Sequence, residues 1–141
     1  MKEYKISAGL KEKLEKDFGR ETHAHEKLDF YADYVKLLKE GMKTTTVRIE
    51  KGKLRYPAAE NLRLIKTRPD DKTYAKPVGI VTLEKIVIKR FGELDDGDAR
   101  RDGFSSKEEL KDGLQKIYGA VPDDELVSIY HIRSAKFDGD A

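Results

Sequence analysis

Residues 41–48 read GMKTTTVR and bring a lysine, a run of threonines and an arginine close together in the chain. A lysine binds anions or, once its pKa is lowered, acts as a base. A threonine hydroxyl attacks or positions a water, and an arginine pairs with phosphate through two parallel hydrogen bonds. In an extended strand, Thr46 and Arg48 share a face, and Lys43, at the corner before the strand, can turn toward them. An edge strand with solvated Lys43 and Arg48 is the alternative, and the residues alone leave both interpretations open.

Positive charge is concentrated around and after this strand. Residues 43–68 contain eight Lys or Arg and two Glu, a local excess of +6 in a chain whose formal net charge is +2. Such segregation is typical of a surface that contacts phosphates, and an aromatic side chain within it can stack on a base. A solvated basic loop is the alternative. The candidate nucleic-acid-binding residues are Lys43, Arg48, Lys51, Lys53, Arg55, Tyr56 and Arg63.

A further candidate residue is Asp102, which precedes Gly103 and Phe104 in the sequence DARRDGF. An aspartate before a glycine is commonly turn chemistry. Its functional interpretation is a carboxylate that pairs with Lys43 or Arg48 and orients a hydroxyl or a water. The sequence alone does not choose between these interpretations.

Other chemistries find little support in the sequence. The chain has no cysteine, which excludes disulfides, thiolate metal sites and cysteine nucleophiles. His23 and His25 lie two positions apart without an evident third ligand, so no metal site is expected, and His131 is expected to be structural. No glycine-rich phosphate-binding motif and no zinc-hydrolase motif occurs, and we expect no cofactor.

The helices are predicted from apolar spacing and end signals. Leu10, Leu14 and Phe18 recur every four residues before Gly19, which indicates a helix over 10–18. An amphipathic helix is expected over 31–39, closed by Gly41, with one face formed by Tyr31, Tyr34, Val35 and Leu38. A third is expected over 105–119, where Ser105 or Ser106 begins a capping box and Leu110, Leu114 and Ile117 form the buried stripe.

β-branched and alternating apolar residues predict the strands, over 28–31, 43–49, 61–67, 78–91 and 125–137. Gly79 is expected to mark a bulge where the strand bends. The polar stretches 20–27, 50–60 and 68–77 are interpreted as turns or loops, and 92–104 as an acidic loop with one helical turn. These elements predict an α+β fold: a small mixed β-barrel with flanking helices.

The length of 141 residues fits one folded unit, and we expect an N-terminal helical extension over 1–26 before the main domain, 27–141. The first residues lack the apolar core of a signal peptide, and no run approaches the ~20 apolar residues of a membrane helix. We therefore expect a cytoplasmic protein without a membrane partner.

Three blocks of the chain together resemble an ASCH (activating signal cointegrator homology) domain: YADYVKLLKEGMKTTTVR, DARRDGFSSKEELKDGLQKIYG and ELVSIYHIR. Gly41, Lys43, Thr46 and Arg48 match the pattern G-x-K-x-x-T-x-R. The resemblance covers roughly residues 28–133 and implies a PUA-like β-barrel that binds RNA in a cleft beside the barrel.

A bacterial branch with the same motif hydrolyses 4-acetylcytidine with a lysine, a threonine and a glutamate. The resemblance places these roles on Lys43, Thr46 and Asp102, where aspartate is one methylene shorter than the glutamate. A carboxylate set back by about 1 Å can cost about a hundredfold in rate. In such a hydrolysis Thr46 is the nucleophile or positions water, Lys43 is the base, and Asp102 must contact Thr46 or the water, since contact with Lys43 raises the lysine pKa.

Two functions follow as hypotheses. The first is an RNA- or nucleotide-binding module whose partner is single-stranded RNA, a nucleoside or a nucleotide. The second is a small hydrolase, either an amidohydrolase on 4-acetylcytidine-like nucleosides or a ribonuclease, with Lys43, Thr46 and Asp102 as catalytic residues. An interaction domain that recruits a protein through residues 1–24 stays open as a third.

Overall fold

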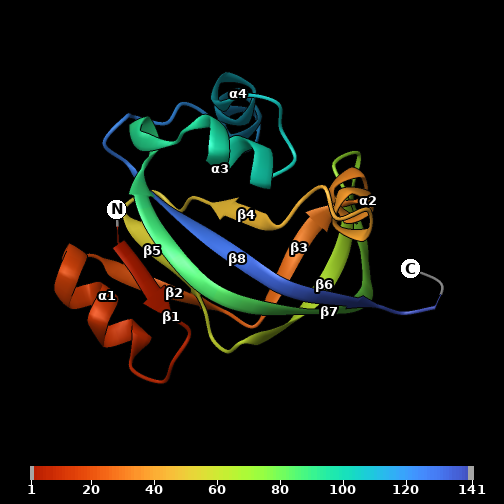
Figure 1. Ribbon diagram of the computed structural model, residues 1–141, viewed down its shortest axis with the longest axis horizontal. Coiled ribbons are helices and arrows are strands. Elements are labelled where there is room, and N and C mark those ends of the chain that lie inside the picture. The colour runs from red at the N-terminus through yellow and green to blue at the C-terminus, as the bar shows by residue number, and fades with distance from the viewer. Residues whose placement is uncertain (1, 140–141) are drawn as a thin grey trace.

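A long antiparallel pair of strands, β7 (Asp71–Arg90) and β8 (Leu126–Phe137), forms the centre of the fold in the computed structural model, which describes residues 2–139 (Figure 1). β6 (Asn61–Arg68) pairs with β7 on one side, and β3 (Lys27–Tyr31) pairs in parallel with β6. β4 (Thr45–Arg48) pairs with β8 on the other side. The order along the sheet is therefore β3-β6-β7-β8-β4, with β3 and β4 at its two ends.

The N-terminal residues contribute two further strands. β1 (Lys2–Lys5) pairs with β7 beside this path and makes the sheet six-stranded. β2 (Glu21–His25) pairs in parallel with β5 (Lys53–Pro57) in a separate two-stranded sheet. The stretches 20–27 and 50–60 were both interpreted as loops, and that interpretation is wrong. Both strands are largely polar, and Leu54, which is fully buried, gives too weak an apolar signal on its own.

Helices lie on opposite sides of the sheet (Figure 1). α3 (Asp96–Arg101) and α4 (Lys107–Tyr118) follow the short 3-10 turn η1 (Phe91–Glu93) and lie on the side of β4 and β8. α1 (Leu10–Phe18) lies near β1 and β2, and α2 (Ala32–Lys39) follows β3 directly. The helices predicted at 10–18, 31–39 and 105–119 are confirmed to within two residues at each end, and the turn predicted within 92–104 is α3.

The strands of the central pair carry apolar side chains on both faces. Ile86 and Ile88 belong to one core cluster, whereas Val87, between them, belongs to a second cluster with Leu110 and Leu114 of α4. Successive strand residues point to opposite faces, so this continuous apolar run is buried on both sides. Ile117, predicted to be buried with the α4 stripe, is instead 46% exposed.

Residues before position 27 share the core of the rest of the chain. Leu10 and Leu14 of α1 are buried in the same cluster as Leu28 and Leu64. The division into residues 1–26 and 27–141 stays a prediction. Met1 and the last two residues of that division lie outside the described residues. Within 2–139, no helix is both long and apolar enough to cross a membrane.

The bulge predicted at Gly79 is confirmed. The register between β6 and β7 shifts where Leu64 pairs with Gly79 and Ile65 pairs with Pro77. A Cβ at Gly79 would lie 2.1 Å from the carbonyl oxygen of Lys136 on β8. Only glycine fits this close approach of two backbones, which lets β7 bend while it stays paired on both sides. The turn expected over 68–77 is shorter than predicted, because β7 already begins at Asp71.

The expected α+β class is confirmed, but the expected closed barrel is not. Among residues 2–139, strand pairing leaves the six-stranded sheet open between β3 and β4. A side chain connects these end strands instead: the Nη2 of Arg48 on β4 donates a 2.9 Å hydrogen bond to the carbonyl oxygen of Asp29 on β3. The opening of the sheet therefore lies between β3 and β4, and β4 carries the second half of the GMKTTTVR motif.

Candidate functional site

A cleft of about 270 Å³ lies between the end strands β3 and β4 and is covered by residues of α2 and α4. Lys43, Thr46, Arg48 and Asp102, the four residues singled out by the sequence, all line it. They come from separate segments, the α2–β4 connection, β4 and the end of α3. The fold thus places the lysine, hydroxyl, guanidinium and carboxylate around one space.

The end of α2 sets the position of Lys43. Gly41 has a φ of 74°, in the left-handed region, and the backbone N–H groups of Met42 and Lys43 donate to the carbonyl oxygen of Leu37. The next residue, Thr44, donates a 2.7 Å backbone hydrogen bond to Arg101 at the end of α3. This backbone contact holds Lys43 beside Asp102, the residue that follows Arg101.

Asp102 is the C-cap residue of α3, and the chain reverses directly after it. Gly103 has a φ of 92°, and a Cβ there would lie 3.0 Å from the side chain of Leu37. Phe104 then donates a 2.8 Å backbone hydrogen bond to Ala99. The glycine of the DGF sequence therefore turns Asp102 and Phe104 toward the same cleft.

Lys43 and Asp102 form a buried ion pair, each 5% exposed. The Nζ of Lys43 donates a 2.8 Å hydrogen bond to Oδ1 of Asp102 and a 3.2 Å hydrogen bond to its carbonyl oxygen. Burial lowers the pKa of Lys43, although Asp102 acts in the opposite direction. Burial likewise raises the pKa of Asp102 against the effect of Lys43. Desolvation disfavours the charged form of each side chain, and the opposite charge of the partner acts against it.

Asp102 contacts a different threonine from the one that a hydrolysis requires. Thr45 donates a 3.4 Å hydrogen bond to Oδ1 of Asp102, whereas the hydroxyl of Thr46 accepts a 2.9 Å hydrogen bond from Nε of Arg48. The condition that Asp102 contact Thr46 rather than Lys43 is therefore not met by side-chain hydrogen bonds among residues 2–139. The other carboxylate oxygen of Asp102, Oδ2, has no hydrogen-bond partner within residues 2–139.

Arg48 is fixed from three directions. Its guanidinium lies 4.8 Å from the centre of the Phe30 ring and also donates to Thr46 and to the carbonyl oxygen of Asp29. Ring stacking and directional hydrogen bonds together hold an arginine in one orientation. Arg48 therefore enters the cleft as a preorganised cation.

Aromatic residues line the rest of the cleft. The rings of Tyr31 and Tyr34 stack at 6.1 Å between centroids, and Phe104 meets Tyr34 edge-on at 6.3 Å. Tyr118 of α4 is a further lining residue. Tyr31 and Tyr34 had been counted only as part of the buried face of a helix. Their role in the cleft depends on α4, which no local pattern places beside α2.

The other predicted nucleic-acid-binding residues lie away from the cleft lining. Lys51, Lys53 and Arg63 are exposed on other parts of the surface, and Lys53 lies 3.8 Å from the carboxylate of Glu21. Arg55 contacts His25 and lies 3.7 Å from Glu50. Tyr56, expected to stack on a base, is partly buried and packs against the hydrophobic core. Of the predicted nucleic-acid-binding residues, only Lys43 and Arg48 therefore line the cleft.

No family model and no curated protein matches this sequence. Solved structures do resemble its fold. The ASCH domain of Lactobacillus crispatus superposes with a TM-score of 0.57 at 14% identity, over 89% of this chain and 86% of that one. The ASCH protein of Zymomonas mobilis gives 0.51 at 21% identity, over 84% and 71%. The chain therefore has the fold seen in these ASCH-domain structures.

Proposed function

We propose that the cleft binds one nucleoside unit, either free or as one residue of a single-stranded RNA. One observation carries the proposal: a single cleft of about 270 Å³ contains aromatic rings, the Lys43–Asp102 pair and the oriented guanidinium of Arg48. This volume is just below the range typical of small-molecule sites, about 300–1,000 Å³, and suits a ligand of few ring systems. ASCH structures as the neighbours in fold add support at the level of the fold.

The polar groups of the cleft fit a base that carries an exocyclic amino group. Oδ2 of Asp102 can accept a hydrogen bond, as a carboxylate does from N4 of cytosine. Lys43 has three N–H donors and uses two of them on Asp102, so the third can donate to a ring nitrogen or carbonyl of the base. A donor beside an acceptor complements the edge of cytosine, while uracil presents an acceptor to the carboxylate.

The arrangement of charge limits the contact with RNA to a short segment. The guanidinium of Arg48 lies in the cleft, whereas Lys51, Lys53 and Arg63 do not line it. Each phosphate contact adds about −0.7 to the slope of log affinity against log salt for a single strand. We therefore expect a shallow salt dependence, with a slope of about −1, rather than the steep one of an extended basic groove.

Equilibrium titration of the chain with cytidine, uridine and adenosine tests the proposal. We expect cytidine to bind at least about tenfold more tightly than uridine, the discrimination of a single good base contact. Asp102→Asn should remove most of this preference. Lys51→Gln, an exposed residue outside the cleft, is the matched control and should leave it unchanged. Absence of binding by all three nucleosides at millimolar concentration would overturn the proposal.

A second function, hydrolysis of 4-acetylcytidine or of RNA, is favoured by the environment of Lys43. A lysine base must lose its proton near neutral pH, and burial lowers the pKa of Lys43. Thr46 lies in the same cleft, and Arg48 donates to its oxygen, which directs the hydroxyl proton away from Arg48. On this account Thr46 attacks or positions water and Lys43 takes the proton.

Incubation with 4-acetylcytidine and with a short RNA separates this function from binding alone. Released acetate would indicate the amidohydrolase, and shortened RNA the ribonuclease. Asp102→Glu supplies the missing methylene and should raise an amidohydrolase rate by up to about a hundredfold, since about 1 Å of misplacement costs that much. If neither wild type nor Asp102→Glu releases product while cytidine still binds, the function is binding only.

A further inference from the structure

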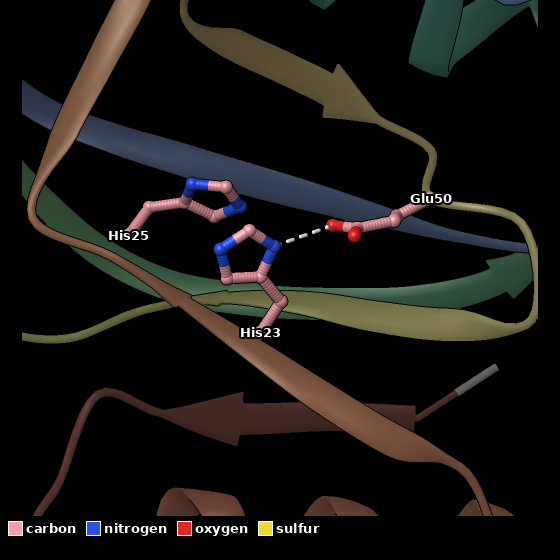
Figure 2. Close-up of side chains that lie close together, drawn as sticks. All are labelled: His23, His25 and Glu50. Atoms are coloured by element: carbon pink, nitrogen blue, oxygen red, sulfur yellow. Dashed lines mark hydrogen bonds and ion pairs between the residues drawn. The ribbon is translucent and has the colours of Figure 1, made fainter.

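Two histidines and a glutamate come together beside the two-stranded sheet (Figure 2), and none of the three lines the cleft. His23 and His25 lie on β2, two positions apart. Glu50 follows β4 and approaches them from a different part of the chain. The sequence suggested only the histidine pair, because the third residue is separated from it by 25 positions or more and becomes a neighbour only through the β2–β5 pairing.

We propose that His23, His25 and Glu50 form a binding site for one divalent transition metal ion of the zinc class. Two imidazole nitrogens and one carboxylate are a donor set that zinc uses in proteins when a fourth position holds water. The same set binds cobalt and nickel, whereas magnesium prefers a shell of oxygen atoms.

The geometry needs only small side-chain movements. One donor atom from each residue lies within 4.8 Å of the others. Around a tetrahedral ion with bonds near 2.0–2.1 Å, donor atoms lie about 3.3 Å apart, so no separation needs to shrink by more than about 1.5 Å. His23 Nδ1 and Glu50 Oε2 are already 2.9 Å apart, as the dashed line in Figure 2 marks. The side chain of His23 is 54% exposed, and its ring lies 4.7 Å from that of His25, centroid to centroid.

Arg55 competes with the ion in this arrangement. Its guanidinium contacts His25, with Nη2 at 3.1 Å from Nδ1, and lies 3.7 Å from Oε2 of Glu50. An arginine cannot share an imidazole lone pair with a metal ion and repels it by charge. Binding of the ion therefore requires the side chain of Arg55, which is 23% exposed on β5, to turn outward.

A bound ion would link two parts of the fold. β2 belongs to the two-stranded sheet, while Glu50 lies two residues after Arg48, which lines the cleft. Ligands from both segments would restrict the end of β4 as well as β2. Its three ligands do not line the cleft, so zinc binding can be measured separately from the proposed nucleoside binding.

Zinc binding by the full chain, without a histidine tag, tests the proposal. Cobalt is added first, since a tetrahedral cobalt site absorbs visible light, and zinc then displaces it. We expect one ion per chain, and at least about a tenfold loss of affinity in His23→Gln and in Glu50→Gln, since even outer-shell changes cost tenfold or more. His131→Gln, the third histidine of the chain, is the matched control and should bind as wild type does.

Arg55→Met removes the competing cation and should bind zinc several-fold more tightly than wild type. Urea unfolding of each variant without metal checks that the fold is retained. The proposal is overturned by wild type that binds no zinc at about 100 µM, a concentration that would saturate a specific zinc site. It is equally overturned by wild-type affinity in His23→Gln, or by Arg55→Met binding no more tightly than wild type.

Discussion

Lys43 donates a 2.8 Å hydrogen bond to the carboxylate of Asp102, 59 residues away in the sequence, and both side chains are buried beside the cleft. The contact depends on two turns, one after α2 and one after α3, that are joined by the backbone hydrogen bond from Thr44 to Arg101. The pair therefore connects the GMKTTTVR motif to the DGF motif, and it places a donor and an acceptor side by side in the lining of the cleft.

Breaking this pair should destabilise the protein more than removing it entirely. Lys43→Met leaves a buried carboxylate without its partner, and we expect the free energy of unfolding to fall by about 3–5 kcal/mol. The double variant Lys43→Met/Asp102→Leu should recover most of that loss. Urea unfolding of the two single variants and the double variant measures the coupling. Lys85→Met, which loses an exposed contact with Glu3, is the control and should change stability by less than about 1 kcal/mol.

If Lys43→Met and the double variant unfold at the same urea concentration, the buried carboxylate carries no penalty. The ion pair described here would then be contradicted.

Gly113 of α4 keeps the cleft open. A Cβ at this position would lie 3.1 Å from the ring of Phe104, which lines the cleft. Gly113→Ala should therefore displace the ring and lower the affinity for cytidine several-fold, although alanine favours the helix by up to about 1 kcal/mol. Titration with cytidine and thermal unfolding separate the two effects. Gly9→Ala, where no atom lies within 4 Å of the added carbon, is the control. Unchanged affinity in Gly113→Ala would show that the ring does not contact the ligand.

The hydroxyl of Tyr130 is buried on β8, across from Thr46, without a hydrogen-bond partner among residues 2–139. An unsatisfied buried hydroxyl costs free energy, so Tyr130→Phe should raise the free energy of unfolding by about 1 kcal/mol. Tyr4→Phe is the comparison: it loses a 2.6 Å hydrogen bond to Asp17 and should lower stability by about the same amount. A loss of stability in Tyr130→Phe would mean that its hydroxyl is hydrogen-bonded in solution.

Stability should decrease on the acid side partly through His131. Burial, together with the charges of Lys85 and Arg101, lowers the pKa of His131 below 6.5. The unfolded chain therefore binds a proton more readily than the folded protein, and stability is lost as pH falls from about 6.5 toward the folded-state pKa. His131→Gln should lose less stability than wild type between about pH 7.5 and pH 5.5. Equal losses in both proteins, measured by urea unfolding, would contradict this role.

Much of the fold is predictable from local pattern. The capped helix α4, the β-branched strand β4 and the bulge at Gly79 all have signals within a few residues. β2 and β5 were missed because their backbones are satisfied by each other while most of their side chains are polar, so neither shows an apolar period. The sheet was expected to close into a barrel because the predicted strands are closely spaced along the chain and mostly do not alternate with helices. Nothing in the sequence indicated that Arg48 would connect its end strands.

The candidate site is predictable in part for the same reason. Lys43, Thr46, Arg48 and Asp102 were named from residue type and motif, and they line one cleft. The detailed pairing was not predictable, since it depends on angles at two turns: Asp102 contacts Thr45 rather than Thr46. Basic residues close in sequence to the motif were expected to extend the site. β5 carries Lys53 and Arg55 into the other sheet, away from the cleft lining.

The location of nucleoside binding is the most direct test of the account. Backbone amide NMR shifts, recorded while cytidine is added to the protein, report which residues the ligand approaches. The account predicts that the largest changes fall at residues 43–48 and 102–104 and at Gly113, and that they disappear in Arg48→Gln. Shifts confined to residues 51–63, or none at saturating cytidine, would contradict it.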